Sequence, residues 1–289
     1  MHYEGDIIRP PSEADSILLQ ATVGCSHNKC TFCGAYLDKR FFIKKQDVIL
    51  EDIAFAAKHF KKQRRIFLCD GDALIIPQKR LAPLLTEIKD KLPRITRVGA
   101  YANVKSLKTK SLEDLRKLKR LGLGIIYMGL ESGDDKTLEN VRKEGDRAAM
   151  IEQAHKVLEA GIKLNVTVML GLAGLSRSNV HAIQTGEALS EMGPNHVAAL
   201  TFIPVPGTPL FKKWKAGDFM LPDPMQMLSE LRTILKHTHL SKGLFLSNHA
   251  SNYLPLRVRL PRGKKDALKL LDKALAGNVP LKPEGMRAL

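Results

Sequence analysis

Residues 111–133 read SLEDLRKLKRLGLGIIYMGLESG, and this stretch decides the fold. The part up to Gly122 is typical of a helix, because Ser111 is a favoured N-cap residue and glycine readily adopts the left-handed conformation that ends a helix. The part after Gly122 is an almost continuous apolar run, which is typical of a strand in a parallel sheet covered on both faces. A polar loop with another glycine closes the unit.

The same order of helix, glycine, apolar run and polar loop occurs twice more, at 146–174 and 178–207. Asp146 predicts the start of the first of these helices, and Ser178 or Asn179 predicts the start of the second. Three copies of one pattern indicate a chain built from repeated helix–strand units.

Earlier in the chain, three more apolar runs predict strands: SILLQATVG (16–24), RIFLCDG (65–71) and RVGAYAN (97–103). Strands that alternate with helices form parallel βαβ units with right-handed crossovers. We therefore expect an α/β fold, namely a partial (β/α)6 TIM-like barrel followed by a helical and irregular C-terminal extension. A doubly wound sheet is the alternative that the spacing leaves open. Both folds bind ligands at the carboxyl ends of their strands.

Along the chain we expect an N-terminal extension (1–15), a core barrel (16–211) and a C-terminal extension (212–289) that closes the mouth of the barrel. The last segment contains predicted helices at 224–240 and 264–276. Between them lies the irregular stretch GLFLSNHASNYLPLRVRLPRG.

The composition limits the class of partner. The 289-residue chain has 46 Lys and Arg against 30 Asp and Glu, which gives a formal net charge of +16. Such a charge indicates either an anionic partner, namely RNA or a substrate that bears phosphates or carboxylates, or only a well-solvated surface. RNA is the less favoured partner, because no compact RNA-binding motif accompanies the charge. The first residues do not resemble a signal peptide, and no apolar run reaches the ~18 residues that span a bilayer. We therefore expect a cytoplasmic protein without a membrane partner.

Three of the four cysteines lie in TVGCSHNKCTFCGAY (22–36), directly after the first predicted strand. In a cytoplasmic protein such a group indicates a metal centre rather than disulfides. A closed zinc site would need His27 as the fourth ligand, at a poor spacing. A plant-type [2Fe–2S] electron-transfer centre matches the C-x4-C-x2-C spacing and would take Cys69 as its fourth ligand.

The third interpretation is a [4Fe–4S] cluster held by only three thiolates, those of Cys25, Cys30 and Cys33. One iron of such a cluster lacks a protein ligand, so a substrate or cofactor can bind there. This interpretation explains why the group has three cysteines rather than four. It also suits a large barrel better than a small electron carrier does.

Together with the cysteine loop, motifs at the ends of successive predicted strands resemble the radical S-adenosylmethionine (radical SAM) superfamily over residues 15–210. The resemblance rests on Phe32, CDGDAL (69–74), GLESGDDKTL (129–138), VTVMLGLAG (166–174) and PVPGTPL (204–210). These motifs are similar to those of methylthiotransferases, of the radical domain of the Elongator catalytic subunit and of coproporphyrinogen-oxidase-like proteins.

The resemblance implies a [4Fe–4S] cluster on Cys25, Cys30 and Cys33, with S-adenosylmethionine bound to the open iron. It implies that the cofactor is contacted by Phe32, Asp70, Gly71, Asp72, Glu131, Ser132, Val168 and Pro206. Two features depart from the common family pattern. Four residues instead of three separate the first two cysteines, and Gly71-Asp72 stands where Gly-Glu is usual.

The resemblance further implies that the chain cleaves S-adenosylmethionine reductively to methionine and a 5′-deoxyadenosyl radical, which acts on a substrate that the sequence does not identify. The reaction would need a low-potential electron donor of the flavodoxin or ferredoxin type. The alternative function is that of a non-catalytic carrier with the same fold, which delivers heme or clusters. Some homologues of oxygen-independent coproporphyrinogen oxidase keep this fold and act mainly in heme delivery.

Three residues are candidates for catalytic contacts with the substrate. Asn103 ends the third predicted strand, and His249 and Tyr253 lie in SNHASNYLPL (247–256) of the C-terminal extension. A histidine titrates near neutral pH, which suits acid–base chemistry. Ligand pockets often form where an additional element closes a barrel mouth, so we expect part of 247–256 to face the cluster.

Overall fold

The computed structural model describes residues 1–288, and the chain folds into two compact units. The first unit consists of Met1–Asn28, Ala35–Met128 and Lys156–Leu164. The second consists of Lys29–Gly34, Gly129–His155 and the residues from Asn165 onward. The boundaries that we predicted along the chain, after residues 15 and 211, stay a prediction.

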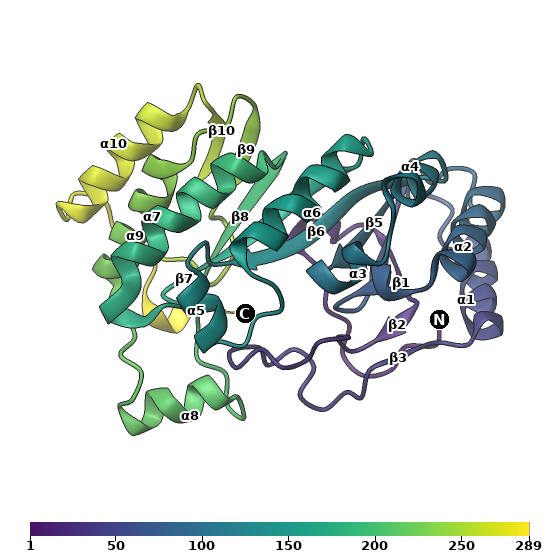
Figure 1. Cartoon of the computed structure of the whole chain (residues 1–289), viewed down its shortest axis with the longest axis horizontal. Helices are drawn as coiled ribbons and strands as arrows, with labels where there is room; N and C mark the ends of the chain where they lie inside the picture. The colour runs from purple at the N-terminus through teal and green to yellow at the C-terminus, as the bar shows by residue number, and fades with distance from the viewer. Residues whose placement is uncertain (289) are drawn as a thin grey trace. The chain divides into compact units, whose positions relative to one another are not determined.

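In the first unit, β1 (Ile17–Gln20), β4 (Arg65–Cys69), β5 (Arg97–Ala102) and the start of β6 (Leu123–Glu131) form a parallel ladder in that order. A short antiparallel pair, β2 (Thr22–Val23) with β3 (Phe42–Ile43), flanks the cysteine loop. The strands are apolar and buried almost throughout, because helices cover one face of the ladder. Those helices are α1 (Gln46–His59), α2 (Gln78–Lys91), α3 (Val104–Lys108) and α4 (Leu112–Arg120) (Figure 1).

In the second unit, β7 (Lys163–Leu170), β8 (His196–Thr201) and β9 (Gly243–Leu246) run parallel, and β10 (Arg257–Leu260) pairs antiparallel with β9. Against these strands lie α7 (Gly174–Met192), α9 (Pro224–His237) and α10 (Lys264–Leu275), of which α9 packs on both others (Figure 1). Two further helices complete the unit: α5 (Asp135–Asn140) and α8 (Pro209–Ala216). α6 (Arg147–Glu159) begins in this unit and ends in the first, to which the first two residues of β7 also belong. Short 3-10 turns occur at Pro11–Glu13, Ala73–Ile75 and Glu284–Met286.

The strand order β1-β4-β5-β6-β7-β8-β9-β10 confirms the predicted fold class, an α/β fold of the partial, open TIM-like type. All six predicted strands are present and follow one another in sequence order, and within each unit their pairings are parallel. The left-handed glycines also occur where they were expected, at Gly122, Gly161 and Gly193. Sequential parallel neighbours distinguish this fold from a doubly wound sheet, in which the strand order reverses.

Two local predictions were wrong. The helix expected to begin after Ser178 or Asn179 begins at Gly174, because the backbone N–H of Leu175 donates to the carbonyl of Met220 and a tertiary contact thus secures the first turn. The stretch expected to be irregular contains β9 and β10, which extend the sheet. In β10, RVRL alternates exposed and buried residues, which is the pattern of a strand with one covered face.

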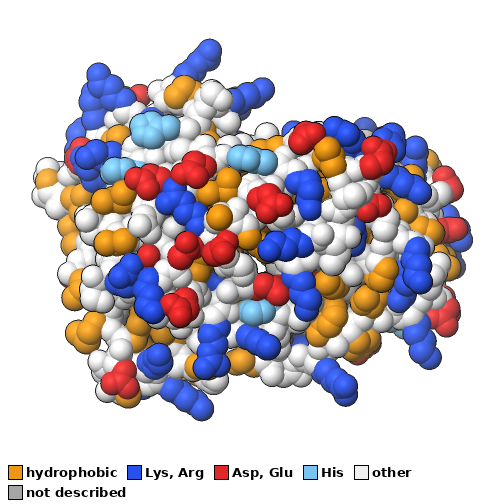
Figure 2. Space-filling view, viewed as in Figure 1, with side chains coloured by type: hydrophobic (Ala, Val, Ile, Leu, Met, Phe, Trp, Pro, Cys, Tyr) orange, Lys and Arg blue, Asp and Glu red, His pale blue; other side chains and the backbone are white. Residues whose placement is uncertain are grey.

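On the face drawn in Figure 2, charges of both signs are interspersed. Figure 2 shows Lys and Arg side chains across the viewed face with Asp and Glu side chains among them. Within residues 1–288, no helix combines the length and the apolar character that a membrane span requires.

Candidate cofactor site

The cysteine loop begins in the first unit, where Asp70 holds it in place. Oδ2 of Asp70 accepts hydrogen bonds from the backbone N–H of Gly24 (3.1 Å) and from Nε2 of Gln20 (3.0 Å), and Nζ of Lys39 lies 3.4 Å away. Asp70 is fully buried at the end of β4. Its contacts are internal to the protein, so they make Asp70 an anchor of the residue that precedes Cys25.

Gly71 allows the loop after β4 to approach the cysteine loop closely. The N–H of Gly71 donates to the carbonyl of Gly24 at 3.1 Å. A Cβ at position 71 would lie 2.7 Å from the ring of Tyr36 and 3.0 Å from Cβ of Cys25. Any side chain at this position would therefore push Cys25 away, which explains the glycine.

Asp72 is linked to two other loops of the first unit. The hydroxyl of Ser26 donates to Oδ2 of Asp72 at 2.5 Å, and Nδ2 of Asn103 donates to the hydroxyl of Ser26 at 3.1 Å. Asn103 also caps α3, since its Oδ1 accepts from the N–H of Ser106. The predicted substrate residue Asn103 thus has a structural role in capping α3. Through Asp72, Ser26 and Asn103, the loops after β2, β4 and β5 are joined at one edge of the sheet.

Cys69 lies in a different environment from the other three cysteines. It is fully buried against Phe67, Ile125 and Tyr127, and its thiol points to the carbonyl of Phe67 at 3.6 Å. Burial, and secondarily the nearby charge of Asp70, raises the pKa of the Cys69 thiol far above its usual value. A metal ligand must be a thiolate, so this environment disfavours the [2Fe–2S] interpretation.

In the second unit, the rest of the cysteine loop lies on an apolar core. Cys30 and Cys33 pack against a buried cluster made of Phe32, Val141, Leu172, Phe202 and Leu210. Thr31 fastens the loop on two sides, because its N–H donates to the carbonyl of Val141 and its carbonyl accepts from the N–H of Leu210, both at 2.9 Å. Both thiols are half-buried at the surface of this core.

Glu131 ends β6 in a left-handed conformation, with φ of 61°. Its Oε1 accepts a hydrogen bond from Nζ of Lys143 at 3.0 Å, whereas Oε2, buried, has no hydrogen-bond partner within residues 1–288. A buried carboxylate oxygen without a donor is costly unless a ligand supplies one. Glu131 therefore fits a cofactor contact better than a merely structural role.

Ser132, the neighbour of Glu131, is fully buried and bonded to His181 of α7. Ser132 Oγ lies 2.7 Å from Nδ1 of His181, whose Nε2 lies 3.3 Å from Oε1 of Glu230 on α9. The serine, histidine and carboxylate have the order of a hydrolytic triad, but all three side chains are inaccessible. The histidine and the carboxylate therefore position Ser132, and Ser132 is not a nucleophile that attacks a substrate.

Glu230 also holds the loop that follows β7. Its Oε1 accepts from the N–H of Gly171 at 2.5 Å, and its Oε2 accepts from the hydroxyl of Ser178. Gly171 is left-handed, and a Cβ there would lie 2.3 Å from Met227. We call His181 and Glu230, together with Ser132 and Gly171, the buried His181–Glu230 network.

Sequence reasoning missed His181 and Glu230, although both carry a signal. Each polar residue stands on the apolar face of its helix: Glu230 lies between buried Met227 and Ile234, and His181 lies seven residues before buried Ala188. Polar side chains at such positions need buried partners.

The remaining predicted residues lie at several places in the second unit. Val168 is fully buried in β7, and Pro206 is exposed in the loop before α8. His249 pairs with the hydroxyl of Ser251 (2.9 Å), and burial lowers its pKa. The hydroxyl of Tyr253 donates to Glu284 at 2.6 Å, and burial followed by this bond raises its pKa.

The stretch 247–256 lies at the carboxyl end of β8. Asn252 accepts from the hydroxyl of Thr201 (2.7 Å) and donates to the carbonyl of Ala199 (2.8 Å). Ser251 accepts from the N–H of Thr201 at 3.1 Å. This is the edge of the sheet at which the ligand was expected.

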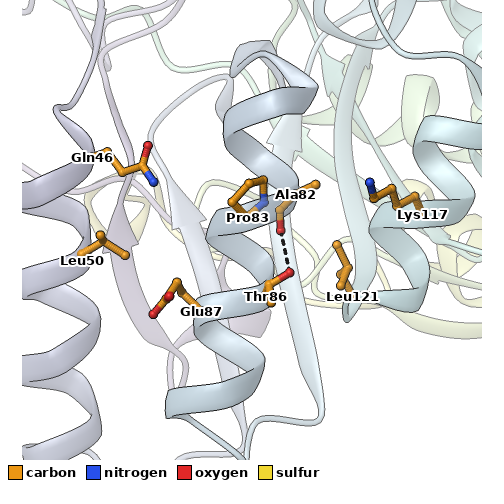
Figure 3. Close-up of a pocket in the computed structure, with 8 residues that line it drawn as sticks. All are labelled: Gln46, Leu50, Ala82, Pro83, Thr86, Glu87, Lys117 and Leu121. Atoms are coloured by element: carbon orange, nitrogen blue, oxygen red, sulfur yellow. Dashed lines mark hydrogen bonds between the residues drawn. The ribbon is translucent and has the colours of Figure 1, made fainter.

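A separate groove of about 400 Å³ lies among α1, α2 and α4 of the first unit (Figure 3). It is lined by Gln46, Leu50, Ala82, Pro83, Thr86, Glu87, Lys117 and Leu121. None of the predicted cofactor residues lines it, and the hydroxyl of Thr86 is already bonded to the carbonyl of Ala82 (3.1 Å).

Comparison with known proteins agrees with this geometry. The family model of the radical SAM superfamily matches residues 19–184. The chain belongs to the radical SAM superfamily. Members of this superfamily use a [4Fe–4S] cluster and S-adenosylmethionine, which are therefore the cofactors of this radical SAM protein.

The relatives of this radical SAM protein are distant. Biotin synthase of Neorickettsia sennetsu is 27% identical over 202 residues, which cover 68% of this chain and 59% of the synthase. An uncharacterized protein of Methanocaldococcus jannaschii, MJ0486, is 23% identical over 264 residues, which cover 87% of this chain and 80% of MJ0486. The chain thus spans little more than half of the synthase.

Among solved structures, coproporphyrinogen III oxidase of Escherichia coli has a TM-score of 0.57 at 16% identity, covering 76% of this chain and 51% of the oxidase. Methylornithine synthase has a TM-score of 0.54 at 16% identity, covering 78% of this chain and 63% of the synthase. At such identities the likeness concerns the fold alone.

The residues of this radical SAM protein fit its two cofactors. Three half-buried thiols are the donor set that iron–sulfur clusters take. Glu131 offers the buried acceptor that the ammonium group of S-adenosylmethionine needs.

Proposed function

We propose that this chain is an enzyme that cleaves S-adenosylmethionine reductively and directs the product radical to a substrate at the carboxyl ends of the strands. One observation carries the proposal. The cysteine loop is bonded through its backbone to strand-end loops at both of its ends, Gly24 to Gly71 in the first unit and Thr31 to Val141 in the second. That edge of a parallel α/β sheet is where such folds perform chemistry.

In this proposal Cys25, Cys30 and Cys33 hold the cluster. When bound, the cluster and S-adenosylmethionine supply a one-electron cleavage that yields methionine and a 5′-deoxyadenosyl radical. Glu131 accepts a hydrogen bond from the cofactor through Oε2, and Asp72 holds Ser26 beside the first thiol. Within the buried His181–Glu230 network, His181 and Glu230 keep Ser132 and Gly171 in place, so that the surrounding loops do not have to become ordered when the cofactor binds.

The residues of 247–256 and the tail that covers them form the proposed substrate wall. They belong to the C-terminal extension and reach the end of β8 through Asn252 and Ser251. Excluding water at this edge protects a reactive intermediate, which is the usual task of an element that closes a barrel. The formal charge of +16 suits an anionic substrate.

The test is anaerobic reconstitution followed by reduction in the presence of S-adenosylmethionine. We expect about four irons for each chain and the release of 5′-deoxyadenosine, even when no substrate is added. A chain that binds heme with a Soret band but releases no 5′-deoxyadenosine would instead be a carrier. Two irons with a [2Fe–2S] spectrum would overturn the assignment of the cluster.

A further inference from the structure

An unusual short helix stands next to the cysteine loop in the second unit. α8 reads PLFKKWKA and follows the loop after β8. Its first turn touches the cysteine loop directly, because the N–H of Leu210 donates to the carbonyl of Thr31 at 2.9 Å. Val205, just before the helix, packs on Gly34, where an added Cβ would lie 2.4 Å from it. The helix is therefore built onto the loop that carries Cys30 and Cys33.

The outward side of α8 is cationic. Lys212, Lys213 and Lys215 are exposed, and none of them makes an ion pair within residues 1–288. The segment 209–220 has one acidic residue, the exposed Asp218, so its net charge is positive. Figure 2 shows Lys and Arg side chains at the lower edge of the molecule, where Figure 1 draws α8. Lys29 of the cysteine loop and Arg142, next to the Val141 that bonds Thr31, are exposed cations on the adjoining segments.

An apolar part accompanies these charges. The rings of Phe211 and Trp214 pack with centroids 5.6 Å apart, and Nζ of Lys215 lies 4.8 Å from the Trp214 centroid. Met220, which follows the helix, is 63% exposed. We call the exposed side chains of Lys212, Lys213, Lys215 and Met220, with the two rings, the α8 surface.

We propose that the α8 surface is the docking site of an acidic, low-potential electron-donor protein, and that the electron enters the protein beside Cys30 and Cys33. The inference rests on the proposed function, because only a redox-active cluster needs such a partner. In the transfer, a reduced flavin or iron–sulfur donor loses one electron and the cluster gains it, while no atom changes place.

Three properties favour this partner. Lysines around a small apolar centre give charge complementarity, which accelerates the encounter with an acidic protein. Electron-transfer complexes use small interfaces, and a two-turn helix with one exposed methionine offers a small one. The surface is also fastened to the cysteine loop by a backbone hydrogen bond, so that a docked donor lies against the loop itself.

RNA is the competing partner, since lysines beside aromatic residues also bind single strands. Such binding relies on aromatic faces that are open for base stacking. In α8, Phe211 and Trp214 pack on each other, both are only partly exposed, and Lys215 lies over both rings, 5.8 Å from the Phe211 centroid. The arrangement therefore favours a transient, charge-driven protein contact.

The test uses the reconstituted holoprotein and a pre-reduced bacterial flavodoxin. The double variant Lys212→Glu, Lys213→Glu reverses two charges and keeps the cation–π contact of Lys215 with Trp214. The matched control is Lys265→Glu with Lys269→Glu, which reverses two exposed lysines of α10. Two quantities are measured at low and at high salt: the Kd of the flavodoxin by calorimetry, and the rate of cluster reduction by stopped flow.

At low salt we expect the α8 variant to weaken flavodoxin binding and to slow cluster reduction by roughly tenfold or more, and we expect high salt to remove the difference. The α10 control should match the unmodified protein. Iron content, and cluster reduction by the small reductant dithionite, should be equal in all three proteins. A missing cluster would refute the proposed function, whereas an intact cluster with equal flavodoxin kinetics in both variants would refute the docking site alone. Loss of binding to bulk tRNA in the α8 variant, with unchanged flavodoxin kinetics, would show an RNA surface instead.

Discussion

The carboxylate of Glu230 accepts a hydrogen bond at 2.5 Å from the backbone N–H of Gly171, and it thereby joins the C-terminal extension to the loop that follows β7. The same carboxylate faces His181, which holds Ser132 beside Glu131. One buried side chain of α9 thus sets two loops at the carboxyl edge of the sheet. Residues after 211 thus help to position these two loops.

Changing Glu230 to Ala should destabilise the protein strongly. The change leaves the Gly171 N–H and the Ser178 hydroxyl without their acceptor and removes the carboxylate that lies 3.3 Å from His181. Such losses in a buried network cost about 3 kcal/mol. Urea unfolding of the cluster-free protein measures the effect. Glu152→Ala, at an exposed residue of α6, is the control and should change the free energy of unfolding by less than about 0.5 kcal/mol. Equal stability of the two variants would show that the buried His181–Glu230 network does not stabilise the fold.

The cluster should depend on three cysteines and not on the fourth. Cys25→Ala, Cys30→Ala and Cys33→Ala should each abolish the [4Fe–4S] EPR signal and lower the iron content of the reconstituted protein. Cys69→Ala should keep both, because its thiol is buried beside Phe67 with a raised pKa. Loss of iron in the Cys69 variant would restore the [2Fe–2S] interpretation.

The sequence predicted the repeating elements because their signals are local. Ser111 caps a helix, Gly122 ends it, and the apolar run after it becomes β6. The start of α7 could not be predicted, because it depends on Met220, which is 45 residues away from Leu175. β9 was missed because its pairing with β8 is a long-range property that its four residues do not show.

The same distinction applies to the candidate site. The cysteine loop and the GLES motif are contiguous and were visible in the sequence. The anchoring role of Asp70 towards Gly24 was not, because hydrogen bonds that converge on one carboxylate are seen only after folding. His181 and Glu230 belong to helices, where a single polar residue on an apolar face is a weak signal beside a motif.

Glu131→Gln should weaken the binding of S-adenosylmethionine and leave the iron content intact. The variant loses the negative charge that would meet the ammonium group, and a hydrogen bond to a charged group contributes ~1.5–3 kcal/mol, or roughly a ten- to hundredfold change in Kd. Binding is measured by the shift of the cluster EPR signal during titration. Glu139→Gln, an exposed residue paired with Lys136, should bind normally. Normal affinity in the Glu131 variant would move the cofactor pocket elsewhere.

Asp134 should contribute an acid-sensitive part of the stability. Burial opposes the ionisation of Asp134, but the Arg177 and Thr137 hydrogen bonds outweigh it and hold the pKa of Asp134 below its usual 3.8. A folded-state pKa below the unfolded one gives stability that is present above the unfolded pKa and is lost as the pH falls through the folded pKa. Asp134→Asn should therefore flatten the fall in unfolding free energy below about pH 4. If the free energy of unfolding of the variant falls at acid pH as steeply as that of the unmodified protein, other carboxylates determine the loss of stability.

The C-terminal tail should hold the proposed substrate wall. The Arg287 side chain donates to the carbonyl of Ser251 at 2.7 Å and to the carbonyl of Phe202 at 3.4 Å, and its guanidinium lies 4.1 Å from the centroid of the Tyr253 ring. Removing this side chain loosens the hold of the tail on the loop 247–256 but leaves the N–H of Lys282 bonded to the carbonyl of Tyr253 (2.8 Å) and Asn252 bonded to β8.

Arg287→Ala should thus speed hydrogen exchange in 247–256 without changing iron content or the affinity for S-adenosylmethionine. Arg257→Ala, an exposed residue of β10, is the matched control and should exchange as the unmodified protein does. Because a loose wall admits water and positions the substrate poorly, the Arg287 variant should still release 5′-deoxyadenosine while coupling less of it to substrate turnover. Faster exchange with fully coupled turnover would show that 247–256 braces the fold and does not bind the substrate.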